Sequence, residues 1–165
     1  MALSTSTRQK IEQHRDRYPY PRSAILPALW EVQHEQGYVT PEGMAEVATL
    51  LGLQSSEVEA VATFYSMYFR APAGQHSVLV CLNVSCALRG AEDVVEHLQR
   101  RLDCPPGETT ADNTYTWAST PECLGACDVA PAMQVDHHTH GNLTPERIDS
   151  LLARVAQRPP HPHGG

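Results

Sequence analysis

The chain has 165 residues, which is enough for one domain of ordinary size or for two small units. Its apolar fraction is 41%, close to that of globular proteins, so the chain can form a hydrophobic core. The formal net charge is −7 and no block of Lys and Arg is present, which argues against a nucleic-acid groove and against binding to an anionic membrane surface.

The N-terminal segment, MALSTSTRQKIEQHRDR, lacks the apolar stretch of a secretory signal. No apolar run approaches the roughly 20 residues needed to cross a bilayer. We therefore expect a soluble, cytoplasmic chain with no direct membrane insertion. In a reducing cytoplasm, closely spaced cysteines are more typical of metal or redox sites than of structural disulfides.

Residues 7–70 are predicted to form a helical N-terminal domain, a bundle or arm of four short amphipathic helices. Apolar residues recur at helical spacing within residues 22–36, and Gly37 is typical of a helix end. The string TPE at residues 40–42 indicates the next helix start, because a hydroxyl cap precedes proline at the first helical position.

A fourth helix is predicted from the capping-box pattern Ser56-x-x-Glu59, with apolar positions that continue to Phe69. The apolar stripes of these helices indicate a core, and a partner-binding face is the alternative interpretation. Residues 70–76 then have the composition of a linker.

Residues 77–157 are predicted to form a thioredoxin-like β-α-β-β-β-α domain, which makes the whole chain α+β or α/β. The expected elements are a strand at 77–84, a helix at 88–102, a strand at 114–119, a hairpin within 132–142 and a helix at 143–157. Residues 158–165, rich in Pro and Gly, are expected to be a disordered tail.

Four of the five cysteines form two close pairs, Cys81-x4-Cys86 and Cys123-x3-Cys127, and each pair follows a predicted strand. Parallel strands joined by a crossover helix end on the same edge of a sheet, so we expect the two pairs to face one another. Four thiolates favour zinc, Cu(I) or an iron–sulfur cluster, and the spacing alone leaves these open. Cys104 lies in a turn-rich loop and is interpreted as a bystander.

A 2Fe-2S cluster held by four thiolates carries net negative charge and needs hydrogen-bond donors. We expect these donors to come from a helix N-terminus directly after Cys86 and from backbone N–H groups near Gly90, Gly125 and Ala126. Arg89 is a further candidate, with a solvated surface arginine as the alternative interpretation.

The histidines His137, His138 and His140 are close in sequence but share their spacing with no cysteine or carboxylate ligand. We interpret them as part of an exposed hairpin turn, with metal binding as the alternative. No glycine-rich nucleotide loop, Walker motif or Ser-His-Asp order is present, so no nucleotide site or catalytic nucleophile is predicted on this chain.

The strings VCLNVSCALRGA, PECLGACDVAPAMQVD and GNLTPERID resemble the 24-kDa (E-type) subunit family of respiratory complex I, the thioredoxin-like 2Fe-2S ferredoxins of NADH–quinone oxidoreductases. EAVATFYSMYFR resembles a helix motif of the same family, so Phe64, Tyr65 and Met67 are expected on a helix that is partly core and partly interface. The resemblance covers residues 7–157. The segment HHTHG departs from the family pattern, which puts the hairpin contacts in question but not the ligands.

The resemblance implies that Cys81, Cys86, Cys123 and Cys127 bind the iron of one 2Fe-2S cluster. It also implies a non-catalytic electron-transfer subunit. The expected partners are a flavoprotein (51-kDa, F-type) subunit, which holds FMN, NADH and a 4Fe-4S cluster, and the larger iron–sulfur subunit of the peripheral arm. The expected place is the peripheral arm on the cytoplasmic face of the inner membrane.

Three other functions remain open at this point. The same domain serves NAD-linked hydrogenases and formate dehydrogenases, so the resemblance leaves the parent complex undecided. A zinc-stabilised interaction module without a redox role and a free-standing ferredoxin are the other two.

Overall fold

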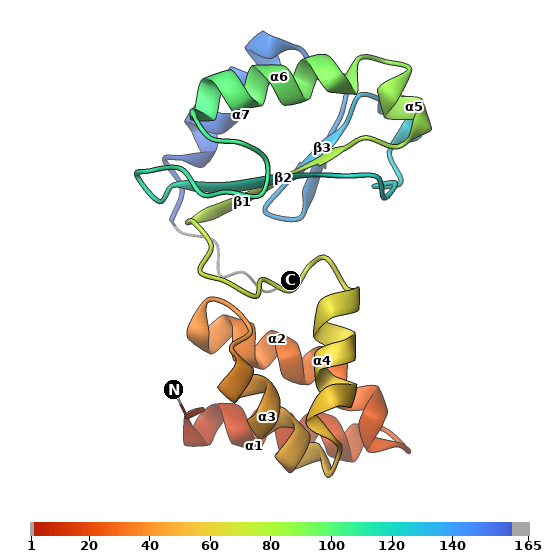
Figure 1. Ribbon diagram of the computed structural model, residues 1–165, viewed down its shortest axis with the longest axis vertical. Coiled ribbons are helices and arrows are strands. Elements are labelled where there is room, and N and C mark those ends of the chain that lie inside the picture. The colour runs from red at the N-terminus through yellow and green to blue at the C-terminus, as the bar shows by residue number, and fades with distance from the viewer. Residues whose placement is uncertain (1, 160–165) are drawn as a thin grey trace. The chain divides into compact units, whose positions relative to one another are not determined.

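The computed structural model describes residues 2–159, and Figure 1 shows the arrangement of the elements. The described chain divides into two compact units, one within residues 2–72 and the other within residues 73–159. Most of the expected tail, residues 160–165, lies outside the described residues. Within the described part, no helix is both long enough and apolar enough to cross a membrane.

Unit 1 is helical throughout, as the apolar periodicity predicts. Its elements are α1 (Thr5–Arg17), the 3-10 helix η1 (Pro21–Ala24), α2 (Ile25–Gln36), α3 (Pro41–Leu51) and α4 (Ser55–Phe64). Its core is aliphatic and includes the buried side chains Ile11, Ile25, Leu29, Val32, Val47 and Val58. The Thr40 hydroxyl accepts the Gly43 N–H at 2.9 Å and caps α3, as predicted.

The predicted capping box of α4 was wrong by two residues. The helix is capped by Gln54, whose backbone N–H donates to Glu57 Oε2 at 3.1 Å. The predicted extension to Phe69 was also wrong, because α4 ends at Phe64, Tyr65 has an extended backbone, and a turn follows. Phe64 therefore lies in the helix, whereas Tyr65 is its C-cap.

A buried amide explains where α4 ends. The side chain of Gln33 is fully buried; its amide nitrogen donates to Met67 O at 3.2 Å and its amide oxygen accepts the Phe69 N–H at 2.7 Å. Phe69 O in turn accepts the Val39 N–H at 2.7 Å. A polar group this deep needs partners, so the segment after α4 supplies backbone groups to Gln33 instead of continuing the helix.

Unit 2 contains a four-stranded mixed sheet in the order β2-β1-β3-β4. Its elements are β1 (His76–Cys81), α5 (Val84–Ala87), α6 (Ala91–Leu102), β2 (Tyr115–Thr120), a 3-10 turn (Cys127–Val129), β3 (Met133–Val135), β4 (His138–His140) and α7 (Pro145–Val155). Strands β1 and β2 are parallel, whereas β3 is antiparallel to both β1 and β4. The predicted β-α-β-β-β-α order is confirmed, with the short helix α5 as an addition.

Helices α6 and α7 lie on the same side of the sheet (Figure 1). Alternate strand residues point toward them, and the core includes the fully buried side chains Leu98, Trp117, Met133, Ile148 and Leu152. The polar atoms of two buried aromatic residues form hydrogen bonds: Tyr115 OH donates to Leu152 O at 2.6 Å, and Trp117 Nε1 donates to Cys104 O at 3.1 Å. This core holds the ends of β1 and β2 in place.

Candidate functional site

The carboxyl ends of β1 and β2 meet at one edge of the sheet, as their parallel pairing requires. Cys81 is the last residue of β1 and lies opposite Thr120, the last residue of β2. Cys123 follows three residues beyond Thr120. The loops that leave the two strands therefore start side by side, and each loop carries one pair of cysteines.

Hydrogen bonds join these two loops across the sheet edge. The Leu82 N–H donates to Thr120 O at 2.8 Å, and the Asn83 side-chain amide donates to Pro121 O at 2.8 Å. The thiol of Cys81 lies 3.5 Å from Glu122 O, which immediately precedes Cys123. The loops are thus fixed relative to one another before any ligand is considered.

The first pair of thiols is buried. Cys81 and Cys86 are each only 2% exposed, and their side chains hydrogen-bond to one another. Burial raises the pKa of the Cys86 thiol, although a hydrogen bond from the backbone of Ala132 acts in the opposite direction. Without a metal, the Cys86 sulfur therefore favours the neutral thiol.

The second pair is exposed at the rim. The Sγ atoms of Cys123 and Cys127 lie 3.3 Å apart, and the Gly125 N–H donates to Cys123 Sγ at 3.4 Å. That N–H lowers the pKa of Cys123, whereas the hydrogen bond with Cys123 raises the pKa of Cys127. Gly125 has a φ of +74°, a conformation that glycine adopts without steric cost and that presents its N–H to the sulfur.

The expected source of donors after Cys86 was wrong in detail. Cys86 lies inside the four-residue helix α5, and the next helix, α6, starts only at Ala91. The N–H groups of Ala87 and Leu88 are used within α5, since they donate to Asn83 O and Val84 O. The sulfurs receive backbone N–H groups from Gly125, as predicted, and from Ala132, which precedes β3 and was not predicted.

Sequence reasoning missed two contributors to this site. The Ser85 side chain hydrogen-bonds to the thiol of Cys127, which ties the first loop to the second pair. Ala132 comes from a third segment, brought close by the antiparallel pairing of β3 with β1. Ser85 is adjacent to Cys86, so the sequence could have indicated its hydroxyl as a donor. The backbone N–H of Ala132 could not be found in this way, because every residue except proline has one.

The donor set fits a binuclear cluster. The four thiols are all free and are arranged as two pairs, one buried and one exposed, at one sheet edge. In a 2Fe-2S cluster each iron takes two protein thiolates, which is the pairing that these loops provide.

Exposed apolar side chains flank the cysteines. Val84 and Leu88, at either end of α5, are 67% and 82% exposed, while Cys86 between them is buried. Large apolar side chains this exposed are candidates for contact with a partner.

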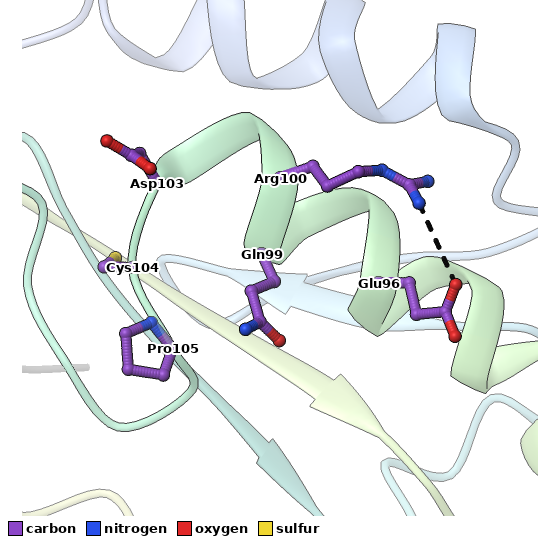
Figure 2. Close-up of a pocket in the computed structure, with 6 residues that line it drawn as sticks. All are labelled: Glu96, Gln99, Arg100, Asp103, Cys104 and Pro105. Atoms are coloured by element: carbon purple, nitrogen blue, oxygen red, sulfur yellow. Dashed lines mark ion pairs between the residues drawn. The ribbon is translucent and has the colours of Figure 1, made fainter.

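The histidine cluster and Cys104, also singled out by the sequence, belong to other segments of unit 2. His137 is in the β3–β4 turn with a φ of +64°, and His138 and His140 are in β4. Cys104 lines a surface pocket of about 490 Å³ at the end of α6 (Figure 2). The same pocket contains the exposed ion pair between Arg100 and Glu96, whose charged atoms are 3.9 Å apart.

Comparison with known proteins points to one family. The sequence pattern of the thioredoxin-like 2Fe-2S ferredoxin family matches residues 11–156. The second E-type subunit of NADH-quinone oxidoreductase from Rhizobium meliloti (strain 1021) is 45% identical over 153 residues, which are 92% of this chain and 90% of that protein. The E-type subunit of the same oxidoreductase from Escherichia coli (strain K12) is 41% identical over 152 residues, covering 92% of this chain and 91% of that protein.

Among solved structures, an NAD+-reducing NiFe-hydrogenase in the H2-reduced state is similar with a TM-score of 0.67 and 28% identity. The match covers 81% of this chain but only 23% of the hydrogenase chain. The same domain architecture is thus found as part of a much longer polypeptide.

Proposed function

The chain belongs to the thioredoxin-like 2Fe-2S ferredoxin family, and from this premise we propose that it is the E-type electron-transfer subunit of an NADH–quinone oxidoreductase. The observation that carries the proposal is that two cysteine pairs meet at one edge of the sheet. The two relatives described above are E-type subunits, and this chain aligns with about nine-tenths of each.

We assign Cys81 and Cys86 to one iron of the cluster and Cys123 and Cys127 to the other, following the pairing of the thiols. When bound, a 2Fe-2S cluster supplies a carrier for one electron at a time. The chain's own contribution is to hold the four thiolates and to offset their negative charge. The backbone N–H of Gly125 points at one sulfur and the Ala132 backbone at another, and such donors raise the reduction potential.

The subunit is proposed to have no catalytic activity of its own and to act only by holding the cluster that carries the electron. Its electron donor would be the FMN of the flavoprotein subunit, which would also bind NADH and a 4Fe-4S cluster. The larger iron–sulfur subunit would be the second partner. The proposed location of the chain is the peripheral arm, on the cytoplasmic face of the membrane. Residues 7–70 and 77–157 are proposed as the helical domain and the cluster domain.

The exposed side chains of Val84 and Leu88 support docking of the flavoprotein subunit beside the cysteines. Leu88→Asp should therefore slow reduction by NADH through the flavoprotein while the visible absorbance of the cluster is retained. Loss of the absorbance together with the reduction would assign Leu88 to folding instead.

A second candidate is the same role in an NAD-linked hydrogenase. It is favoured by one observation, the structural match to the NAD+-reducing hydrogenase. Coexpression with each candidate flavoprotein subunit, followed by purification of the complex, would separate the two parent complexes.

Iron and acid-labile sulfide counts, together with EPR of the dithionite-reduced chain, test the cofactor. About two irons and two sulfides per chain and an S = 1/2 signal are expected. Cys86→Ala and Cys123→Ala should abolish both, whereas Cys104→Ala, which changes the one cysteine outside the site, should leave both intact. A colourless chain that contains zinc alone would overturn the proposal.

A further inference from the structure

Unit 2 carries a group of arginine and histidine side chains at the sheet edge opposite β2. We call it the α7–β4 basic patch, and it consists of Arg147, Arg154, Arg158, His138 and His140. The three arginines are exposed, in a chain whose formal net charge is −7. The sequence shows no basic block because the patch is assembled from two elements.

The three arginines share one side of α7. Arg154 follows Arg147 by seven residues, and Arg158 follows it by eleven, in the turn that continues the helix. At 3.6 residues per turn, these separations are close to two and three full turns. The side chains therefore form a stripe along the helix.

The carboxylates of α7 lie on its other flank. Asp149 accepts hydrogen bonds from His97 at 3.0 Å and pairs with Arg101 at 3.4 Å, and both partners belong to α6. Asp149 thus faces α6, and the exposed Glu146 lies near Asp149 and His97 on the same flank. The arginine stripe is on the flank away from α6, above the edge strand β4.

The pKa of His140 indicates that the residues of the patch lie close together. This pKa is lowered by partial burial and by the positive charges of Arg154, His138, Arg147 and Arg158, so all of these groups lie close to one ring. Within residues 2–159, none of the three arginines has a carboxylate partner within 4.0 Å. The positive charge of the patch is therefore not neutralised by the described chain.

We propose that the α7–β4 basic patch is a docking surface for an acidic, extended segment of a partner protein. Arginine forks bind carboxylates with two parallel hydrogen bonds, which suits aspartate and glutamate side chains. Strand β4 pairs only with β3 in the described sheet, so its outer edge offers backbone groups to an added extended chain.

The charge distribution favours a short acidic segment over a larger polyanion. Nucleic acids and anionic membranes present charge over a wide surface, and the remaining acidic surface of this chain repels them. A short segment meets only the patch. The patch is at the β4 edge, whereas the cysteine pairs are at the ends of β1 and β2. A negative result for peptide binding would therefore not contradict the proposed cluster site.

Binding of a fluorescein-labelled hexaglutamate peptide, measured by fluorescence anisotropy with the full-length protein, tests the proposal. The double variant Arg154→Gln/Arg158→Gln should bind about fivefold or more weakly, the loss expected for two exposed charge pairs. The matched control Arg17→Gln/Arg100→Gln changes the net charge equally at exposed sites outside the patch and should shift the dissociation constant less than about twofold.

Zero-length cross-linking locates the bound peptide. Lys10 is the sole lysine of the sequence, so Arg154→Lys followed by carbodiimide treatment should join the peptide to position 154. Equal weakening in both double variants, or cross-links that avoid position 154, would overturn the proposal. Tighter binding of phosphatidylglycerol vesicles or duplex DNA at the same salt, or cross-linked dimers of this chain without peptide, would also overturn it.

Discussion

Unit 2 contains two His–Asp pairs that differ mainly in burial. His76 Nδ1 lies 2.7 Å from Asp136 Oδ2, and the two side chains are 1% and 4% exposed. His97 Nε2 lies 3.0 Å from Asp149 Oδ1, and those side chains are 18% and 45% exposed. The same interaction can therefore be compared in two environments of one domain.

Asp136→Ala is expected to be strongly destabilising. The carboxylate accepts a hydrogen bond from the His76 ring and another from the Ser77 N–H at 2.9 Å, so its removal leaves the buried ring and the partly buried N–H without that partner. The other ring nitrogen of His76, Nε2, is already buried without one. At about 1–3 kcal/mol for each unsatisfied group, unfolding should become easier by about 4 kcal/mol.

Two further variants isolate the cause. Asp136 has a φ of +48°, which asparagine tolerates better than alanine, so Asp136→Asn keeps the turn and an acceptor for Ser77 and should cost about half as much. Asp149→Ala removes the exposed pair and should cost only about 0.5 kcal/mol, since solvent screens it.

Urea denaturation with tryptophan fluorescence measures these differences. Trp117 is fully buried in unit 2, and Trp30→Phe removes the only other tryptophan, so the signal reports unit 2 alone. The burial argument is refuted if Asp136→Ala costs no more than Asp149→Ala.

Three other substitutions test local features by thermal or urea denaturation. Gly43→Ala should cost about 1–3 kcal/mol, because a Cβ there would lie 2.6 Å from Val32 Cγ1; a neutral result would show that α2 and α3 can separate. Thr144→Ala should cost about 1 kcal/mol through loss of the α7 cap, and an unchanged midpoint would contradict the capping role. Hydrogen bonds, chiefly the one from the Thr110 hydroxyl, lower the pKa of Asp112 to about 2. Its contribution to stability is therefore complete above about pH 5 and is lost as the pH falls toward 2. Asp112→Ala should reduce this loss of stability in acid, and an unchanged loss would exclude Asp112 as its source.

Local signals predicted much of the secondary structure. The Thr40 and Thr144 caps, each followed by proline, mark the starts of α3 and α7 correctly, because a cap acts within one helical turn. The end of α4 was missed because Gln33, more than thirty residues earlier in the chain, holds the backbone of Met67 and Phe69. A hydrogen bond of that range leaves no periodic trace in the sequence.

For the candidate site, spacing and strand order placed four cysteines on two loops at one edge of the sheet. The difference between the buried and the exposed pair was not predictable, since burial of Cys86 depends on packing around α5. The donors to the sulfurs were only partly foreseen: Gly125 was named, but Ala132 was not. Backbone N–H groups occur at nearly every position, so only the fold selects which of them point at a sulfur.

The amino-acid sequence by itself determined the family, the helix caps, the apolar faces and the positions of the thiols, because each of these depends on residue identity or short spacing. Tertiary structure alone decided which groups meet: Ser85 with Cys127, His76 with Asp136, and the arginines of α7 with the histidines of β4. The physical reason is that hydrogen bonds and charge–charge interactions act over a few ångströms, and the fold sets which distant residues come that close.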